Sequence, residues 1–268
     1  MTAIDLPIRY YRHYVDPDKP NDEAHLAHVH DTIPLPLEHT ALVLVDCWNT
    51  HHNDGVVERM QPVLEDHIAP VLERLRETEA TVVHCPSRDV ASRYPAWTKY
   101  ADDRDLALVD RAKPDAIDWP PAAFTESLAY PGPEDPSEFA YPEYAKMHEP
   151  RAGHPWTHIH DAVAPAPGAD EFVVATGRQL HRLLAHRELL HLVYVGFHTN
   201  ICVRNRPYGI EAMAGRGYNP ILLRDCTQAI ESHDTLEEEL HKQIAIREME
   251  TGTCVTSTGA ELLRGPTH

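Results

Sequence analysis

Short apolar runs alternate with helical patterns along this chain, and this alternation constrains the fold more than any other feature. The runs are continuous, with no regular polar residues between the apolar ones, which is typical of strands buried on both faces. Strands that alternate with helices form a parallel sheet covered by helices on both sides. The sequence therefore predicts an α/β fold with three layers, α-β-α, around a mostly parallel central sheet of about six strands. The expected strands are 41–46, 81–85, 171–175, 192–196 and 221–225, with a possible sixth at 253–256.

Three helices are predicted where apolar residues recur at every third or fourth position. The first is expected to begin near Pro62 and to bend near Pro70. The second lies around 180–184, where three leucines share one face. The last follows a capping box formed by Thr235 and Glu238 and ends before a glycine. Its expected apolar face consists of Leu236, Leu240 and Ile244.

The 268 residues are expected to form a single domain, because no composition change marks a second boundary. Residues 86–168 interrupt the alternation with a stretch rich in Pro, Tyr, Trp and Asp that is too long for an ordinary connection. We interpret this stretch as an insertion that forms a lid or an oligomer contact. Residues 1–38 are expected to form an arm on the outside of the domain.

The charge of the chain excludes several classes of partner. Lys and Arg number 24 and Asp and Glu number 42, which gives a formal net charge of −18. Nucleic-acid binding and attachment to an anionic membrane both need clustered cations, so neither is expected. The 20 histidines would bring the charge to +2 if all were protonated. The expected partners are a small-molecule substrate and further copies of the same chain, as a dimer or tetramer.

The cysteines and the hydropathy indicate a cytoplasmic protein. Five cysteines without paired spacing suit a reducing compartment better than a disulfide framework. The first residues lack a cationic stretch followed by an apolar one, and no apolar run approaches the ~20 residues that span a bilayer. We expect no cofactor.

Chemistry in an open parallel sheet is expected beyond the carboxyl ends of the strands. Asp46 ends the first expected strand, and Cys202 lies six residues beyond the fourth, where a helix should begin. A helix N-terminus lowers the pKa of a thiol, and a carboxylate on the neighbouring strand could take its proton. A small buried hydrophobe is an equally good reading of Cys202 from spacing alone. The other cysteines lie in or beside strands and are expected to be inert: Cys47, Cys85, Cys226 and Cys254.

The segment LVYVGFHTNICVRNRPYGIEAMAGRGYNPILLRD resembles the nucleophile region of the isochorismatase-like cysteine hydrolases, a superfamily that includes nicotinamidases and N-carbamoylsarcosine amidohydrolase. The segment TALVLVDCWNTHH resembles the first strand of that family. The resemblance covers about residues 38–263 without the insertion, and it implies a Rossmann-like arrangement of the three layers. Its matching positions are Gly196, Thr199, Asn200, Cys202, Val203, the Gly217-Tyr218 turn and Asp225.

The resemblance implies a mechanism. Cys202 would be the nucleophile that forms a thioester, and Asp46 the general base, in the hydrolysis of a C–N bond of a small amide, ureide or cyclic imide. A cis peptide bond would lie at Phe197–His198, and the backbone N–H groups of His198 and Cys202 would form the oxyanion hole. The residues expected to contact substrate are Trp48, His198, Thr199 and Asn200.

The chain departs from the family pattern after the third expected strand. Ala175, Thr176 and Gly177 stand where the family has a lysine that pairs with the Asp and the thiolate. The candidate replacements are Lys146, then Lys99 and Lys113 in the insertion, and Arg178, although a planar guanidinium is not equivalent to an ammonium. The missing lysine supports an alternative function, a triad-incomplete member of the fold that binds a ligand or partner without chemistry.

Three further features remain open. No metal is expected, because Asp89-Val90-Ala91 lacks the Asp-x-His of the metal-binding branch, although His51 and His52 could bind one with Asp46. Arg204 and Arg206 could bind a carboxylate of the substrate or a neighbouring subunit. Pro207 makes an irregular or kinked helix after the cysteine the expectation.

Overall fold

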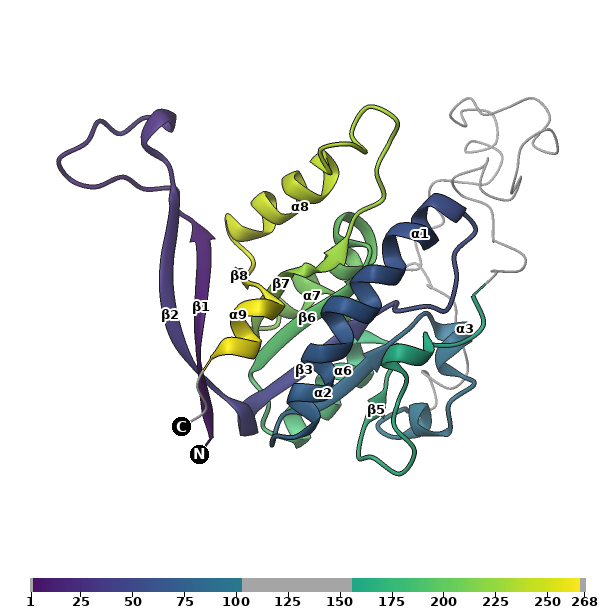
Figure 1. The fold of residues 1–268 in the computed structure, drawn as a ribbon. Coiled ribbons are helices and arrows are strands. Elements are labelled where there is room, and N and C mark those ends of the chain that lie inside the picture. The colour runs from purple at the N-terminus through teal and green to yellow at the C-terminus, as the bar shows by residue number, and fades with distance from the viewer. Residues whose placement is uncertain (1, 103–155, 266–268) are drawn as a thin grey trace, which may run out of the picture.

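The apolar runs form one sheet in the computed structural model, which describes residues 2–102 and 156–265. Within these residues the sheet has eight strands, in the order β2-β1-β8-β7-β6-β3-β4-β5 (Figure 1). The six strands from β8 to β5 are parallel, as the sequence predicts. The strands are β1 (Ala3–Tyr11), β2 (His28–Pro36), β3 (Thr40–Val45), β4 (Thr81–Cys85), β5 (Phe172–Val173), β6 (His191–Phe197), β7 (Asn219–Gln228) and β8 (Val255–Ser257).

The strand order creates a switch point between β3 and β6. The chain moves from β3 to β4 and β5 on one side, and then returns to β6 and continues to β7 and β8 on the other. Val45 lies opposite Gly196 where these two strands end. Ligands bind beyond the carboxyl ends of strands at such a point.

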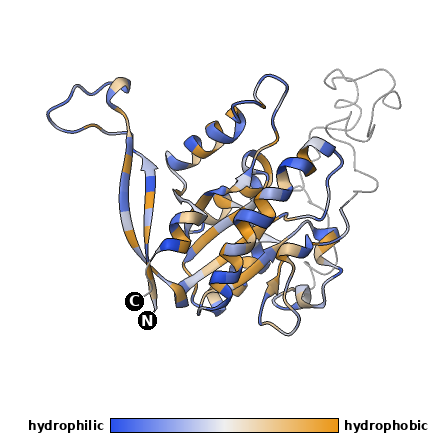
Figure 2. Ribbon diagram, viewed as in Figure 1, coloured by the Kyte–Doolittle hydropathy of each residue, from blue (hydrophilic) through white to orange (hydrophobic). Residues whose placement is uncertain are grey.

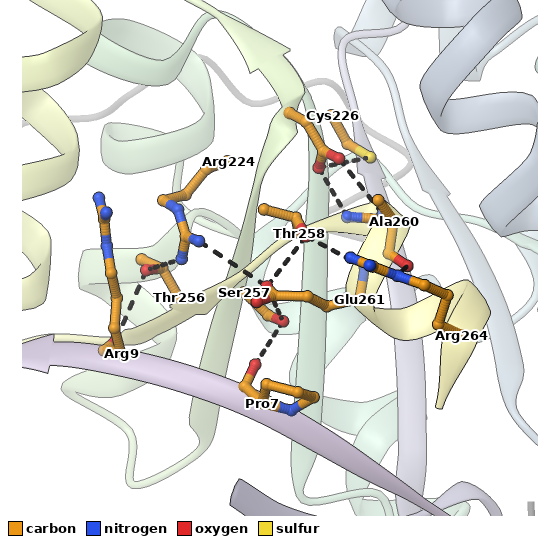
Figure 3. Close-up of polar contacts among 12 residues, drawn as sticks. Pro7, Arg9, Arg224, Cys226, Thr256, Ser257, Thr258, Ala260, Glu261 and Arg264 are labelled. Atoms are coloured by element: carbon orange, nitrogen blue, oxygen red, sulfur yellow. Dashed lines mark hydrogen bonds and ion pairs between the residues drawn. The ribbon is translucent and has the colours of Figure 1, made fainter. Parts of the chain in front are cut away.

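Residues 3–36, within the expected N-terminal arm, form a hairpin that extends the sheet instead of lying on its outside. β1 and β2 are antiparallel to each other, and β1 joins β8 through the pair Arg9 and Thr256. At this joint the Ser257 hydroxyl donates to the carbonyl of Pro7 at 2.6 Å, and Arg224 donates to Thr256 at 2.7 Å (Figure 3). The far end of the hairpin stands out from the body of the molecule (Figure 1).

The first helical stretch begins earlier than expected. α1 (Asp54–Pro62) starts at a cap in which the Asn53 side chain accepts from the Val56 N–H, so Pro62 ends this helix instead of starting it. A π-helical segment (Val63–Ile68) then leads directly into α2 (Ala69–Arg76). The apolar residues at 64–75 are buried as the pattern predicts, but the sequence analysis missed the Asn53 cap.

The apolar face predicted for the last long helix, Leu236, Leu240 and Ile244, is not the face that the helix buries. α8 (Leu240–Glu250) begins after a series of turns, where the Thr235 hydroxyl accepts from the Ser232 N–H instead of forming a capping box. Leu236 and Ile244 are 48% and 54% exposed. The buried face consists of Ala245, Ile246 and Met249 with Glu250. This face prevails because α8 lies against the segment after β6 and against β1 and β8.

Helices cover both faces of the sheet. α1 and α2 lie in front of it in Figure 1, and α6 (Gly177–His186) and α7 (Ile210–Ala214) lie behind it. The shorter α3 (Arg88–Ala91) follows β4, and α9 (Gly259–Arg264), which has no counterpart among the expected helices, follows β8. Figure 2 shows the apolar residues concentrated on the central strands. Among the described helices, none is long and apolar enough to cross a bilayer.

A buried ionic cluster fastens β4 and the start of β5 to α2. The Glu171 carboxylate accepts from Arg76 at 2.6 and 3.1 Å and from His84 at 2.7 Å. Burial raises the pKa of Glu171, but His84 and Arg76 outweigh burial and lower this pKa to about 2. Since the same carboxylate joins three elements far apart in sequence, its ionised form stabilises the folded chain.

Most of the expected insertion lies outside the described residues. Its described parts are 86–102, which includes α3, and 156–168. The expected lid or oligomer contact therefore stays a prediction, and Lys113 and Lys146 lie outside the described residues.

Candidate active site

Asp46 and Cys202 come together at the switch point. Asp46 directly follows β3 in a left-handed backbone conformation, with φ of 48°, and its side chain is fully buried. The thiol of Cys202, itself 8% exposed, lies beside the Asp46 carboxylate, and each group shifts the pKa of the other. Gly196 permits this approach, because a Cβ there would lie 2.0 Å from the carbonyl oxygen of Val45. The two side chains singled out from the sequence thus meet, although 156 positions separate them.

Arg206 is the cation that binds the Asp46 carboxylate. Its Nε and Nη2 donate to Oδ2 of Asp46 at 3.1 and 3.0 Å. The pairing raises the pKa of Arg206, so this guanidinium stays protonated. Arg206 was expected to contact a substrate carboxylate or a neighbouring subunit, because a planar guanidinium four residues beyond the thiol does not match the family's lysine position.

The segment after β5 explains why an arginine can take this place. Gly177 starts α6 where the family lysine was expected, and a Cβ on Gly177 would lie 1.8 Å from the carbonyl oxygen of Pro207. The backbone next to Arg206 therefore packs directly on Gly177. The small residues at 175–177 leave the space that the loop at 206–207 occupies.

The electrostatics keep the thiol protonated in the resting site. Burial raises the pKa of Cys202 to about 12, and the Asp46 charge adds to this effect while Arg206 opposes it. Burial also raises the pKa of Asp46, against the opposing effects of Arg206 and of hydrogen bonds from the Cys202 thiol and the Ser87 backbone. The helix-terminus effect expected to lower the pKa of Cys202 is therefore outweighed by burial.

The backbone around Cys202 is irregular, as Pro207 predicts. Cys202 lies in a π-helical segment (Thr199–Val203) that ends in a turn at 206–209 before α7 begins. The peptide bond Phe197–His198 is cis, as the family resemblance implies. The backbone N–H of His198 points to the thiol of Cys202 and stabilises its negative form. Such an N–H can also donate to an oxyanion that forms beside the sulfur.

Aromatic rings pack against one another beside the site. Trp48 stacks on Trp156 with ring centroids 4.3 Å apart and an interplanar angle of 8°. His198 lies edge-on to Trp48 at 6.4 Å, and His51 lies edge-on to His198 at 5.4 Å. Trp156 was missed from the sequence because it lies in the compositionally unusual insertion. A strand bridge between Trp48 and Ile159 holds this part of the insertion against the end of β3.

Two of the expected substrate residues are occupied by structural contacts. The Thr199 hydroxyl is buried against the Thr227 hydroxyl at 2.8 Å. The Asn200 side chain donates to the Ile230 carbonyl at 3.0 Å and accepts from its N–H at 3.1 Å. Both side chains hold the Cys202 segment to the end of β7.

The other residues considered as cations or ligands of the site lie away from Asp46 and Cys202. Arg178, the expected lysine replacement, pairs with Asp102, and Lys99 lies 3.6 Å from Asp170. Arg204 pairs with Glu211 and Glu248. The rings of His51 and His52 are 3.9 Å apart, yet no group of His, Cys, Asp or Glu in residues 2–102 and 156–265 is placed to hold a metal ion.

Comparison with known proteins identifies the family. A family model described as the isochorismatase domain matches residues 40–261, so the chain belongs to the isochorismatase family, as the sequence motifs imply. No curated protein matches the chain. Similar solved structures include an isochorismatase from Pseudomonas putida KT2440 (15% identity, 87% of this chain and 94% of that chain, TM-score 0.49). Others are a putative isochorismatase-family hydrolase from Chromobacterium violaceum ATCC 12472 (17%, 86% and 97%, 0.49) and the N-carbamoylsarcosine amidase from Thermoplasma acidophilum (16%, 82% and 96%, 0.43).

Proposed function

We propose that this protein is a cysteine hydrolase that cleaves a C–N bond in a small amide, ureide or cyclic imide. Cys202 is the nucleophile, Asp46 the general base and Arg206 the cation that holds Asp46 in place. The observation that carries the proposal is the buried Cys202 thiol beside a carboxylate that Arg206 binds. Membership of the isochorismatase family indicates a hydrolase.

The first half of the reaction forms a thioester. Asp46 takes the proton of the Cys202 thiol as the sulfur attacks the carbonyl carbon, so the negative charge moves from the carboxylate to the substrate oxygen. The backbone N–H groups of His198 and Cys202 donate to this oxyanion. The C–N bond then breaks, and the departing nitrogen takes the proton from Asp46. Arg206 keeps its protons throughout and acts through charge.

The second half releases the acid. A water molecule gives a proton to Asp46 and attacks the thioester carbon, and the C–S bond breaks. The sulfur leaves and recovers the proton from Asp46, which restores the resting pair. Each step exchanges one proton between Asp46 and a neighbouring atom, which suits a carboxyl whose pKa is raised by burial.

The aromatic side chains beside the site support this substrate class. Trp48, Trp156 and His198 are flat groups next to Asp46 and Cys202, and they would suit a planar amide, ureide or imide group. A homo-oligomer and a cytoplasmic location remain part of the proposal.

The alternative, a binding protein without chemistry, rests on the missing lysine. Arg206 removes that reason, because it supplies a positive charge to the same carboxylate. The two functions differ in one outcome, turnover that depends on the Cys202 sulfur.

The test compares two buried cysteines that flank the same carboxylate. Purified protein, Cys202→Ala and Cys47→Ala are incubated with a panel of small amides, ureides and cyclic imides, and ammonia or amine release is measured. Cys47 follows Asp46 in sequence and is 2% exposed, so its variant is the matched control. We expect Cys202→Ala to lose all turnover, Cys47→Ala to retain it, and a quenched reaction to carry an acyl adduct on the Cys202 peptide. Full turnover by Cys202→Ala would show that the mechanism is wrong, and no turnover by any protein would favour the binding alternative.

A further inference from the structure

A guanidinium without an acidic partner lies at the edge of the proposed active site. Arg59 on α1 donates from Nη2 to the carbonyl of Ala229 at 3.4 Å, just beyond the end of β7. Its Nη1 is buried and has no hydrogen-bond partner among the described residues. Buried polar groups in folded proteins are nearly always paired, and a charged N–H is the costliest to leave unpaired. This atom therefore points to a ligand.

Two buried side chains beside Arg59 add further polar groups. His198 is 3% exposed and Gln228 is 1% exposed. Neither amide atom of Gln228 has a hydrogen-bond partner in the described part of the chain, and the His198 ring interacts with the Gln228 backbone. Gln228 pairs with Phe197 across β6 and β7, which places it beside His198, and Ala229 follows it directly. The polar groups of these residues therefore lie at the ends of two adjacent strands.

The charges around this cluster leave Arg59 uncompensated. Arg206 is paired with Asp46. Burial lowers the pKa of His198 to about 4; a hydrogen bond with the Gln228 backbone opposes this effect and the charge of Arg59 adds to it, so the imidazole is neutral at pH 7. In a chain with a net charge of −18, a cation without an acidic partner among the described residues favours an anionic group beside His198.

We propose that Arg59, together with Gln228 and His198, forms a subsite for a carboxylate that the substrate carries beside its scissile amide. The guanidinium and the Gln228 amide N–H groups donate to the carboxylate oxygens, and a neutral His198 donates through one ring nitrogen. The proposal rests on the proposed function, since the scissile amide must lie at Cys202. It narrows the substrates to small amides or ureides of carboxylic acids.

The experiment measures binding in protein that cannot react. Calorimetry on Cys202→Ala compares malonamate, succinamate and glutaramate with the corresponding neutral diamides, which differ only by one carboxylate. We expect at least one monoamide to bind about tenfold or more tightly than its diamide, as charge-assisted hydrogen bonds imply. Adding Arg59→Gln should abolish this preference, and adding Arg59→Lys should retain part of it.

The matched control is Arg264→Gln in the same background. Arg264 is exposed on α9 and donates to the Ala260 carbonyl, so its substitution changes the net charge equally without touching the cluster. Equal affinity for acid and diamide, no binding of either, or an equal loss from Arg264→Gln would overturn the proposal. Because binding is measured without the thiol, failure of the subsite and failure of the thioester mechanism give different results.

Discussion

Replacing Arg206 by glutamine tests whether this arginine does the work of the family's lysine. The substitution removes both hydrogen bonds to Oδ2 of Asp46 and leaves a fully buried carboxylate without its cation. Since Arg206 opposes the effect of burial, its loss raises the pKa of Asp46 further. A carboxyl that is protonated at neutral pH cannot accept the thiol proton.

The magnitude follows from the 3.0 Å separation. Two unit charges at this distance attract by about 5 kcal/mol at an effective dielectric constant near 20. The Arg206 side chain is 30% exposed, so solvent screening reduces this to roughly 2–3 kcal/mol. At about 1.4 kcal/mol per factor of ten, the acid dissociation constant of Asp46 falls by roughly 30- to 100-fold, and on the acidic limb of the pH profile the activity falls by the same factor.

The assay is the pH dependence of kcat/KM, or of Cys202 alkylation by iodoacetamide where no substrate is in hand. Arg206→Gln should move the acidic limb of the profile to higher pH, so activity recovers in alkaline buffer, and Arg206→Lys should lie between the two. Arg204→Gln is the matched control, because Arg204 is 27% exposed in the same segment and pairs with Glu211 and Glu248 instead. An acidic limb that stays in place in Arg206→Gln refutes the reasoning.

Two further predictions concern the packing and the stability of the fold. Gly177→Ala places a Cβ 1.8 Å from the Pro207 carbonyl oxygen, so we expect displacement of the 206–207 loop and the same shift of the pH profile as in Arg206→Gln. The control is Gly252→Ala, because a Cβ at that position has no atom within 4 Å. An unshifted pH profile in Gly177→Ala would contradict the packing argument. Glu171→Gln should lower the free energy of unfolding by about 3 kcal/mol at pH 7, since the pKa of Glu171 is lowered to about 2 in the folded chain. The stabilisation by Glu171 is complete above its unfolded pKa and disappears as the pH falls toward 2, so the denaturation curves of the parent and Glu171→Gln should converge in acid. The control is Glu73→Gln at an exposed position, whose free energy of unfolding should stay within about 0.5 kcal/mol of that of the parent. A constant difference at every pH would show that the carboxylate charge is not the cause.

The parallel sheet and the meeting of residues 46 and 202 could be predicted from the sequence. Strands buried on both faces leave a strong continuous apolar signal, and parallel strands place their carboxyl ends at the same edge. The face of α8 was not predictable in this way, because Leu236, which precedes the helix, and Ile244 within it are left exposed, while Glu250 is buried by Arg9 and His28 of the hairpin. The spacing of apolar residues within a helix does not show which distant element of the chain will pack against that helix.

The cation was missed for a similar reason. Arg206 and Gly177 are 29 positions apart, and only the packing of Pro207 on the glycine brings the guanidinium to Asp46. Trp156 was missed because it lies in the insertion, far in sequence from Trp48, on which it stacks. Sequence spacing located the groups that we propose to react, whereas contacts between remote segments determine which groups surround them.

The hairpin at the margin of the sheet bears on how copies of this chain could associate. β2 is the outermost strand on its side, and it contains Pro34 and Pro36 near one end and Asp31 at its middle. Proline lacks the N–H that a newly added strand would need, and a charge at the rim is costly to cover. A neighbouring subunit is therefore discouraged from continuing the ladder at β2, so self-association there would have to proceed through side chains on helices or loops instead of through backbone pairing.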